Sequence, residues 1–147
     1  MTRKPKPAVV RFYFDADVLG VAKVIAALRN DVTFPGDPGA TIRKRVRPPC
    51  IVADRATPDA DWIPAVSGRG WLIITRDSRI THNLAELAAV KDAGARLVAL
   101  SGREAGTVWE QLEILMSRWR AIEQLLEQPG PFVYRATRSA LSVVALD

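Results

Sequence analysis

The sequence contains one cysteine, Cys50, and one histidine, His82, in 147 residues. One cysteine excludes an intramolecular disulfide and any zinc site built from several cysteines. One histidine likewise excludes the usual zinc sites that are built from several histidines. Few side chains therefore remain as candidate nucleophiles.

Long apolar runs are also lacking. No run approaches the roughly 20 residues that are needed to cross a bilayer. The basic segment at residues 1–7 leads into a short apolar stretch that Arg11 interrupts, which is not the pattern of a signal peptide. We therefore expect a cytoplasmic protein with no membrane segment.

Positive charge is in excess, with 21 Lys and Arg against 16 Asp and Glu and a formal net charge of +5. Seven of the cations lie in two short clusters, one near the N-terminus and one internal: Arg3, Lys4 and Lys6, then Arg43, Lys44, Arg45 and Arg47. Such clusters are typical of a surface that binds a polyanion, and equally of a solvated loop. Charge alone does not decide between these interpretations.

Strand-like and helix-like segments alternate along the chain. Runs of β-branched, aromatic and other apolar residues predict strands at 9–14, 31–34, 71–75, 96–100 and, as a last edge strand, 132–137. Apolar spacings of three and four, with capping signals, predict helices at 18–28, 58–67, 84–93 and 105–126. This alternation predicts an α/β fold, a three-layer α/β/α sandwich around a mostly parallel sheet.

A length of 147 residues suits a single domain, with three segments outside the regular pattern. A basic arm occupies residues 1–8, and no structure is predicted for the tail at 138–147. Residues 35–58 are rich in proline, glycine and basic residues and show little periodicity. We expect them to form a long, flexible, basic loop of functional importance.

The last predicted helix carries an apolar stripe, made of Trp109, Leu112, Met116, Trp119 and Leu126. A stripe at this spacing predicts packing against the core. The alternative is a groove for a partner or a second copy, because two tryptophans are many for one stripe.

Acidic residues gather where predicted strands end. Asp15 and Asp17 follow the first strand, Asp77 follows the strand at 71–75, and Asp59 and Asp61 begin a helix. Function in open α/β sheets gathers beyond the carboxyl ends of the strands, so we expect these acids to converge. Structural interpretations compete with this, since Asp17 and Asp59 would also serve as helix caps and Asp61 would favour a helix dipole.

Converging carboxylates repel one another unless a cation lies between them. Oxygen ligands without His or Cys favour Mg²⁺ or Mn²⁺ over zinc. Such ions activate water and stabilise the charge that develops on a phosphate, which is the chemistry of phosphodiester hydrolysis. The internal basic cluster would supply attraction for a nucleic acid, or would receive an acidic segment of an inhibitory partner.

Three segments in this order resemble the PIN-like ribonuclease superfamily, and in particular the bacterial toxins of VapC type. They are FYFDADVL at 12–19, DADWI at 59–63 and IITRDSRI at 73–80. The resemblance covers roughly residues 9–101. It implies a metal-dependent endoribonuclease, the toxin of a toxin–antitoxin pair, whose partners are RNA, a cognate antitoxin and often a second copy of the chain.

The resemblance also implies site residues. Asp15 and Asp77 would be catalytic metal ligands, together with Asp61 or Asp59, between which one sequence does not decide. We expect Asp15, Asp61 and Asp77 to hold the cation, with Asp17 and Asp59 as nearby supports or substitutes. Asp17 stands where relatives often have Asn, beside the metal.

The residues around Asp77 differ from those of relatives and include two arginines. Relatives often have a further acid just after the position of Asp77, where this chain has Ser78 and Arg79, which puts a second metal in doubt. Arg76 and Arg79 either contact the scissile phosphate or neutralise the acids.

Two other interpretations stay open. Residues 12–18 also resemble the haloacid-dehalogenase-type phosphatases, in which Asp15 would be the nucleophile and Asp17 a general acid/base. That fold would need a later lysine, and Lys91 lies within a predicted helix. The third interpretation is a PIN-like module without activity that binds RNA or a protein.

Overall fold

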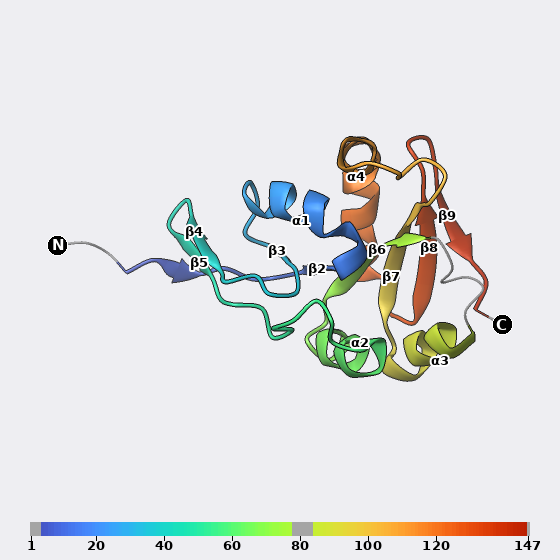
Figure 1. Ribbon diagram of the computed structural model, residues 1–147, viewed down its shortest axis with the longest axis horizontal. Coiled ribbons are helices and arrows are strands. Elements are labelled where there is room, and N and C mark those ends of the chain that lie inside the picture. The colour runs from blue at the N-terminus through green and yellow to red at the C-terminus, as the bar shows by residue number, and fades with distance from the viewer. Residues whose placement is uncertain (1–3, 78–83, 147) are drawn as a thin grey trace.

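The computed structural model describes residues 4–77 and 84–146 (Figure 1). Within them, the main sheet has six strands, in the order β3, β2, β6, β7, β8 and β9. Their bounds are Val32–Thr33 (β3), Phe12–Phe14 (β2), Leu72–Asp77 (β6), Arg96–Ser101 (β7), Phe132–Ala136 (β8) and Leu141–Val144 (β9). Neighbouring strands are parallel, except that β9 runs antiparallel to β8.

Helices connect these strands, and the predicted α/β class is confirmed. A short 3₁₀ helix, η1 (Ala16–Val18), and helix α1 (Leu19–Ala26) lead from β2 to β3. Helix α2 (Asp59–Gly68) precedes β6, and α3 (Leu84–Ala93) lies between β6 and β7. Helix α4 (Val108–Gln124), followed by the 3₁₀ turn η2 (Leu125–Glu127), leads from β7 to β8.

Alternate residues of the central strands pack on opposite faces of the sheet, as the two-residue period of a strand requires. Phe12 and Phe14 pack in one cluster with α1 and α4, whereas Tyr13 packs in a second cluster with α2 and α3. All three side chains are buried because helices cover both faces. This explains why the strands read as continuous apolar runs in the sequence.

Strand order reverses between β2 and β6. The chain leaves β2 for β3 on one side, then returns through α2 to β6, which pairs with the other side of β2. Ligands of open parallel sheets bind beyond the carboxyl ends of the strands at such a reversal. The topology therefore directs attention to the residues that follow Phe14 and Ile74, which are register partners.

The segment 35–58 differs from the predicted loop. Strands β4 (Ala40–Ile42) and β5 (Arg45–Arg47) form an antiparallel hairpin, and β1 (Lys6–Pro7) pairs with β5 in parallel. The two turn residues, Arg43 (φ 49°) and Lys44 (φ 65°), have a left-handed backbone. Glycine or asparagine usually supplies that conformation, so the sequence carries no recognisable turn signal here.

The ends of the main sheet also differ from expectation. The strand at 132–136 is interior, because β9 in the predicted tail pairs with its outer side. The first strand begins at Phe12 instead of Val9, whose side chain is 76% exposed. Ahead of Phe12 the chain turns toward the small sheet β1–β5–β4.

Helix α4 buries a different face from the predicted stripe. Ile114, Leu115 and Ile122 are fully buried, whereas Trp109 is 70% and Met116 is 74% exposed. The rest of the stripe is partly buried at the border of the core. The predicted core packing is therefore wrong for Trp109 and Met116, because the buried residues lie on an adjacent face of the helix. Among the described helices, none has the length and apolar composition to cross a membrane.

Candidate active site

Two carboxylates follow β2 directly, at the reversal of strand order. The backbone N–H of Asp15 donates to the carbonyl of Ile74 in β6 (2.9 Å), which fixes the end of the strand. Asp15 then caps η1, since its Oδ1 accepts a hydrogen bond from the N–H of Ala16 (2.6 Å). The 3₁₀ turn brings Asp17 back toward β6.

Thr75 of β6 joins the two carboxylates. Its hydroxyl Oγ1 lies 3.3 Å from Oδ2 of Asp15 and 2.9 Å and 3.0 Å from the two carboxylate oxygens of Asp17. The backbone N–H of Arg76 also donates to Asp17 (3.2 Å). Asp17 therefore bonds across to β6, and the helix-cap interpretation for it is wrong: α1 has no side-chain cap.

The carboxylates of Asp15 and Asp17 are destabilised in their charged form by burial, and that of Asp15 also by repulsion from Asp17. Burial raises the pKa of Asp15 to about 7, and the neighbouring Asp17 and Asp59 carboxylates add to the rise. Burial also raises the pKa of Asp17, against the opposing effect of hydrogen bonds from Thr75 and Arg76. One hydroxyl proton cannot satisfy two buried carboxylates, so the pair has an unmet demand for positive charge.

Helix α2 brings one of its two acids to this pair. Asp59 contributes to the raised pKa of Asp15, whereas Asp61 is exposed. Residues two apart on a helix point in nearly opposite directions, so both acids cannot face the same site. Asp59 does not cap the helix, because Pro58 holds the cap position and Asp59 Oδ1 accepts from Nε1 of Trp62 (2.9 Å).

Helix α3 adds an acid that the sequence reasoning missed. Burial raises the pKa of Glu86, and a side-chain hydrogen bond to Asp59 and the charge of Asp17 raise it further. Glu86 lies in the first turn of a helix that follows β6, and such helices start at the carboxyl edge of a parallel sheet. That position in the sequence could have indicated Glu86 as a site residue. Thr75 could have been identified in the same way, because it is a polar residue near the end of an apolar strand.

The last predicted acid, Asp77, ends β6 and pairs in register with Ser101 of β7. The structure describes Asp77 by this place in the strand and not by its side chain. Ser78, Arg79 and His82 lie outside the described residues.

A divalent cation at this edge would have to be held by these acids. Among the described side chains, no three acidic, histidine or cysteine residues form a metal-like group. Asp15 and Asp17 nevertheless fit a hard divalent cation, because they offer buried carboxylate oxygens whose mutual repulsion a cation would relieve. Asp77 ends the strand that carries Thr75, so it follows the pair at the same sheet edge.

The predicted cationic cluster lies at the other end of the sheet. Nδ2 of Asn30, just ahead of β3, donates to the carbonyls of Ile42 (2.7 Å) and Arg45 (3.2 Å). The hairpin is thus attached at the amino ends of the strands, and Figure 1 shows it beside the N-terminus. Arg43, Lys44 and Arg45 are not brought to the acids.

Arg47 differs from its expected role as an RNA contact. It is buried, with an ion pair from Nε to Asp37 Oδ2 (2.7 Å). Its Nη1 donates to the carbonyls of Ala26 (3.1 Å) and Arg29 (3.2 Å) at the end of α1. Arg47 therefore fixes the hairpin to the body of the fold.

Other cations do lie at the carboxyl edge. Arg76 follows Thr75, and its Nη2 lies 3.5 Å from the carbonyl of Gly102. Arg103 follows β7, and Arg138 follows β8 and pairs with Glu104 (3.3 Å). Sequence reasoning missed Arg103 and Arg138 because they form no cluster in the sequence.

Lys91, the lysine considered for phosphatase chemistry, is exposed in the last turn of α3, away from the carboxyl edge of the sheet.

Comparison with known proteins adds one positive finding. Residues 11–102 match the model of a family described as PIN like domain. Neither the curated proteins nor the solved structures yielded a match. PIN-like domains are commonly nucleases, and the matched region contains β2, β6, β7 and the acids Asp15, Asp17, Asp59, Asp77 and Glu86. Since the match spans well over half of the 147 residues, the chain belongs to the PIN-like domain family.

Proposed function

We propose that the protein is a metal-dependent endoribonuclease whose cation is held by Asp15 and Asp17, with Asp59, Glu86 and Asp77 around it. The observation that carries the proposal is the pair of buried carboxylates sharing the Thr75 hydroxyl at the reversal of strand order. Membership of the PIN-like domain family, whose members are commonly nucleases, supports it. The proposal includes a three-layer sandwich, supported by a helix pair packed on each sheet face.

Mg²⁺ or Mn²⁺ at this place would supply activation of water and stabilisation of negative charge at the phosphate. The chain's own residues prepare the place for it. Thr75 and the N–H of Arg76 fix the orientation of Asp17, and the η1 turn fixes Asp15. The Arg76 guanidinium, with Arg103 and Arg138 along the same edge, would attract and position the RNA backbone.

The direct test is cleavage of a fluorescent RNA by purified protein, first in EDTA and then with Mg²⁺ or Mn²⁺. We expect cleavage only with the metal, and a loss of at least about 100-fold in Asp15→Asn, because one ligand carboxylate is gone. Asp92→Asn, an exposed acid on α3, is the matched control and keeps full activity. Cleavage that persists in EDTA, or in Asp15→Asn, contradicts the proposal. Hydrolysis of small phosphomonoesters without RNA cleavage would favour the phosphatase, and binding without cleavage the inactive module.

The helix acid is tested by a pair of variants. Asp59 is electrostatically linked to Asp15 and Glu86, and Asp61 is exposed on the other side of α2. We expect Asp59→Asn to lower kcat at least about tenfold and Asp61→Asn to leave it within about twofold. The reverse order would restore Asp61, the residue first expected from the sequence.

A role as the toxin of a toxin–antitoxin pair extends this proposal and is supported by the resemblance of residues 12–19, 59–63 and 73–80 to VapC-type toxins. A cytoplasmic location, a cognate antitoxin and a homodimer belong to the same extension. Induced expression in bacteria should arrest growth with the wild-type chain and not with Asp15→Asn. Equal growth of both strains at equal protein levels would contradict the toxin role and leave the nuclease proposal standing.

A further inference from the structure

We propose that the small sheet β1–β5–β4 is a second RNA-binding surface, separate from the acids. We call the cations on it the cationic sheet, namely Lys4 and Lys6 with Arg43, Lys44 and Arg45. All five side chains are exposed. Among the described residues, no carboxylate lies within ion-pair distance of them.

The arrangement of the cationic sheet favours an anionic occupant. Lys6 and Arg45 are register partners on adjacent strands, which lie about 4.8 Å apart in a sheet. Like charges directly opposite each other destabilise a sheet, and a phosphate between them would remove that cost. The two turn residues, Arg43 and Lys44, hold left-handed conformations that cost energy for residues with a side chain. The hairpin therefore keeps cations where Asn-Gly would fold better.

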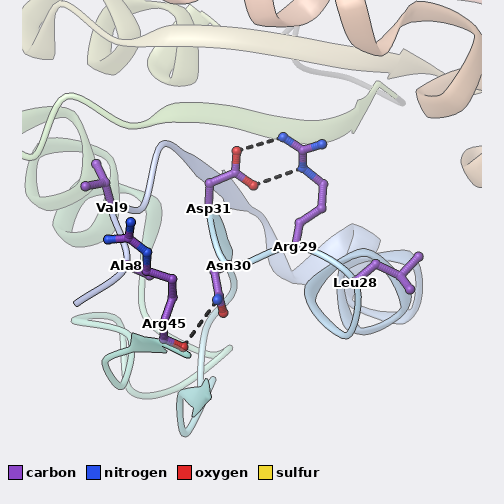
Figure 2. A pocket seen from close by; sticks show the side chains of 7 residues that line it. All are labelled: Ala8, Val9, Leu28, Arg29, Asn30, Asp31 and Arg45. Atoms are coloured by element: carbon purple, nitrogen blue, oxygen red, sulfur yellow. Dashed lines mark hydrogen bonds and ion pairs between the residues drawn. The ribbon is translucent and has the colours of Figure 1, made fainter. Parts of the chain in front are cut away.

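A pocket adjoins the cationic sheet at its base. It has a volume of about 490 Å³ and is lined by residues of three segments, Ala8 and Val9, Leu28 to Asp31, and Arg45. In Figure 2, Arg45 lies on one side of this pocket and Arg29 on the other, with Asn30 and Asp31 between them. Arg29 and Arg11 both pair with Asp31, with Arg29 Nη2 at 2.9 Å and Arg11 Nη2 at 2.6 Å from Oδ2, and both also pair with Glu123 at 3.5 Å and 3.3 Å. A pocket of this volume is in the range of those that hold a nucleotide-sized ligand.

The same surface is poorly suited to a protein partner. Protein interfaces depend on large apolar or aromatic anchors at their centre. Among the exposed large apolar side chains of the described chain, none belongs to the hairpin at 40–47, although Val9 and Leu28 line the adjoining pocket. Lys and Arg on a projecting ribbon match the phosphate contacts that dominate the affinity of nucleic-acid binding. We therefore favour RNA over an acidic protein segment.

The cationic sheet and the acids lie within reach of one RNA strand. Lys6 and Asp15 are nine residues apart, so their Cα atoms are separated by at most about 30 Å. At about 3.4 Å per nucleotide of stacked strand, this span corresponds to roughly nine nucleotides. Anchoring of the RNA that the acids cleave rests on the proposed nuclease function, whereas the binding surface itself does not.

The test measures binding without cleavage. Asp15→Asn protein in EDTA is titrated against a fluorescent 20-nucleotide RNA between 50 and 200 mM salt, with fluorescence anisotropy as the readout. A hairpin variant combines Arg43→Asn, Lys44→Gly and Arg45→Gln, which installs a favoured turn and so preserves the fold. A control variant combines Arg69→Gln, Lys91→Gln and Arg120→Gln, three exposed cations elsewhere. Both sets remove three positive charges, so both net charges fall equally.

The parent protein should make about four phosphate contacts and lose about 50-fold in affinity over this salt range. The hairpin variant should bind at least about tenfold more weakly at 100 mM salt, with a salt slope smaller by about 2. The control variant should match the parent. An equal loss in both variants, no binding by the parent at 50 mM salt, or equal competition by polyglutamate at matched charge would each overturn the proposal. None of these outcomes depends on whether the protein cleaves RNA.

Discussion

Thr75 holds the most consequential position among the single residues. It is a buried polar side chain whose one hydroxyl faces two carboxylates, those of Asp15 and Asp17. Valine would fill the same space without the hydroxyl and would leave both carboxylates without this donor. Glu86 and Asp59 form a second pair of acids, which are joined by a side-chain hydrogen bond.

The raised pKa of Asp15 predicts a pH dependence of stability. Without metal, the folded protein keeps a proton on Asp15 up to about pH 7, whereas the unfolded chain loses it near pH 4. Folding stability from this group is therefore fully present below pH 4 and is lost as pH rises through about 7. The upper bound of the loss is about 4 kcal/mol, less where water reaches the carboxylate.

This dependence is measured by urea unfolding in EDTA at pH 4.5 and pH 7.5, comparing wild type with Asp15→Asn. The variant should gain stability relative to wild type as pH rises. At pH 7.5, Mg²⁺ should raise the Tm of wild type and not that of the variant. A difference between the proteins that is constant with pH would show that Asp15 ionises normally.

The hairpin β4–β5 depends on one buried ion pair. Arg47 and Asp37 are both at least 95% buried, with Nε and Oδ2 2.7 Å apart. Thr33 Oγ1 also donates to Asp37 (2.9 Å), so strand β3 is tied into the same group. The pair therefore joins the small sheet, the main sheet and the end of α1.

Breaking that pair should be costly. Arg47→Met leaves the Asp37 carboxylate buried without its partner, which should lower the free energy of unfolding by about 3–5 kcal/mol. Arg138→Gln, which breaks the exposed pair with Glu104, should cost less than about 1 kcal/mol. Chemical denaturation of the two variants measures both values. A small loss in Arg47→Met would show that the hairpin is not coupled to the body of the fold.

Local sequence patterns predicted the helices and strands well where the apolar periodicity agreed with the capping and turn residues at their ends. Helix α3 has the predicted bounds 84–93, and β6 and β7 lie within two residues of prediction. The hairpin was missed because its turn is Arg-Lys, and β9 because its side chains are mostly exposed or half-buried. Helix α4 was assigned the wrong face since apolar residues occur on two adjacent faces, and tertiary packing selects between them.

Some residues of the candidate site could likewise be predicted from local sequence, and others could not. The strand-end rule was enough to group Asp15 with β6, because parallel strands bring their carboxyl ends together. The choice between Asp59 and Asp61 depends on the rotation of α2, which its Trp62, Ile63 and Val66 packing determines. No local pattern in the sequence contains that rotation.

The candidate-site acids lie at the carboxyl edge of the main sheet, and the cationic sheet lies at the amino edge, so these two groups are separated along the molecule. The net charge of +5 therefore describes neither end. This separation predicts that cleavage depends on RNA length. Above roughly nine nucleotides, KM should fall at least about fivefold while kcat stays the same, because the distal cations add binding and not chemistry.

A series of RNAs from 5 to 25 nucleotides around one cleavable sequence measures this effect. The hairpin variant, with Arg43→Asn, Lys44→Gly and Arg45→Gln, should give a KM that no longer changes with length. A length effect of equal size in that variant would place the distal contact elsewhere.

The pairing of β2 with β6 also sets when the molecule becomes functional during synthesis. Asp15 and Thr75 are 60 positions apart, and their meeting requires the central strand pair to close. At ribosomal rates of about 5–20 residues per second, roughly 3–12 s pass between the synthesis of these two residues. A nascent chain that ends before Thr75 carries Asp15 and Asp17 without the hydroxyl that joins them, so it lacks the surroundings that the two carboxylates have in the folded protein.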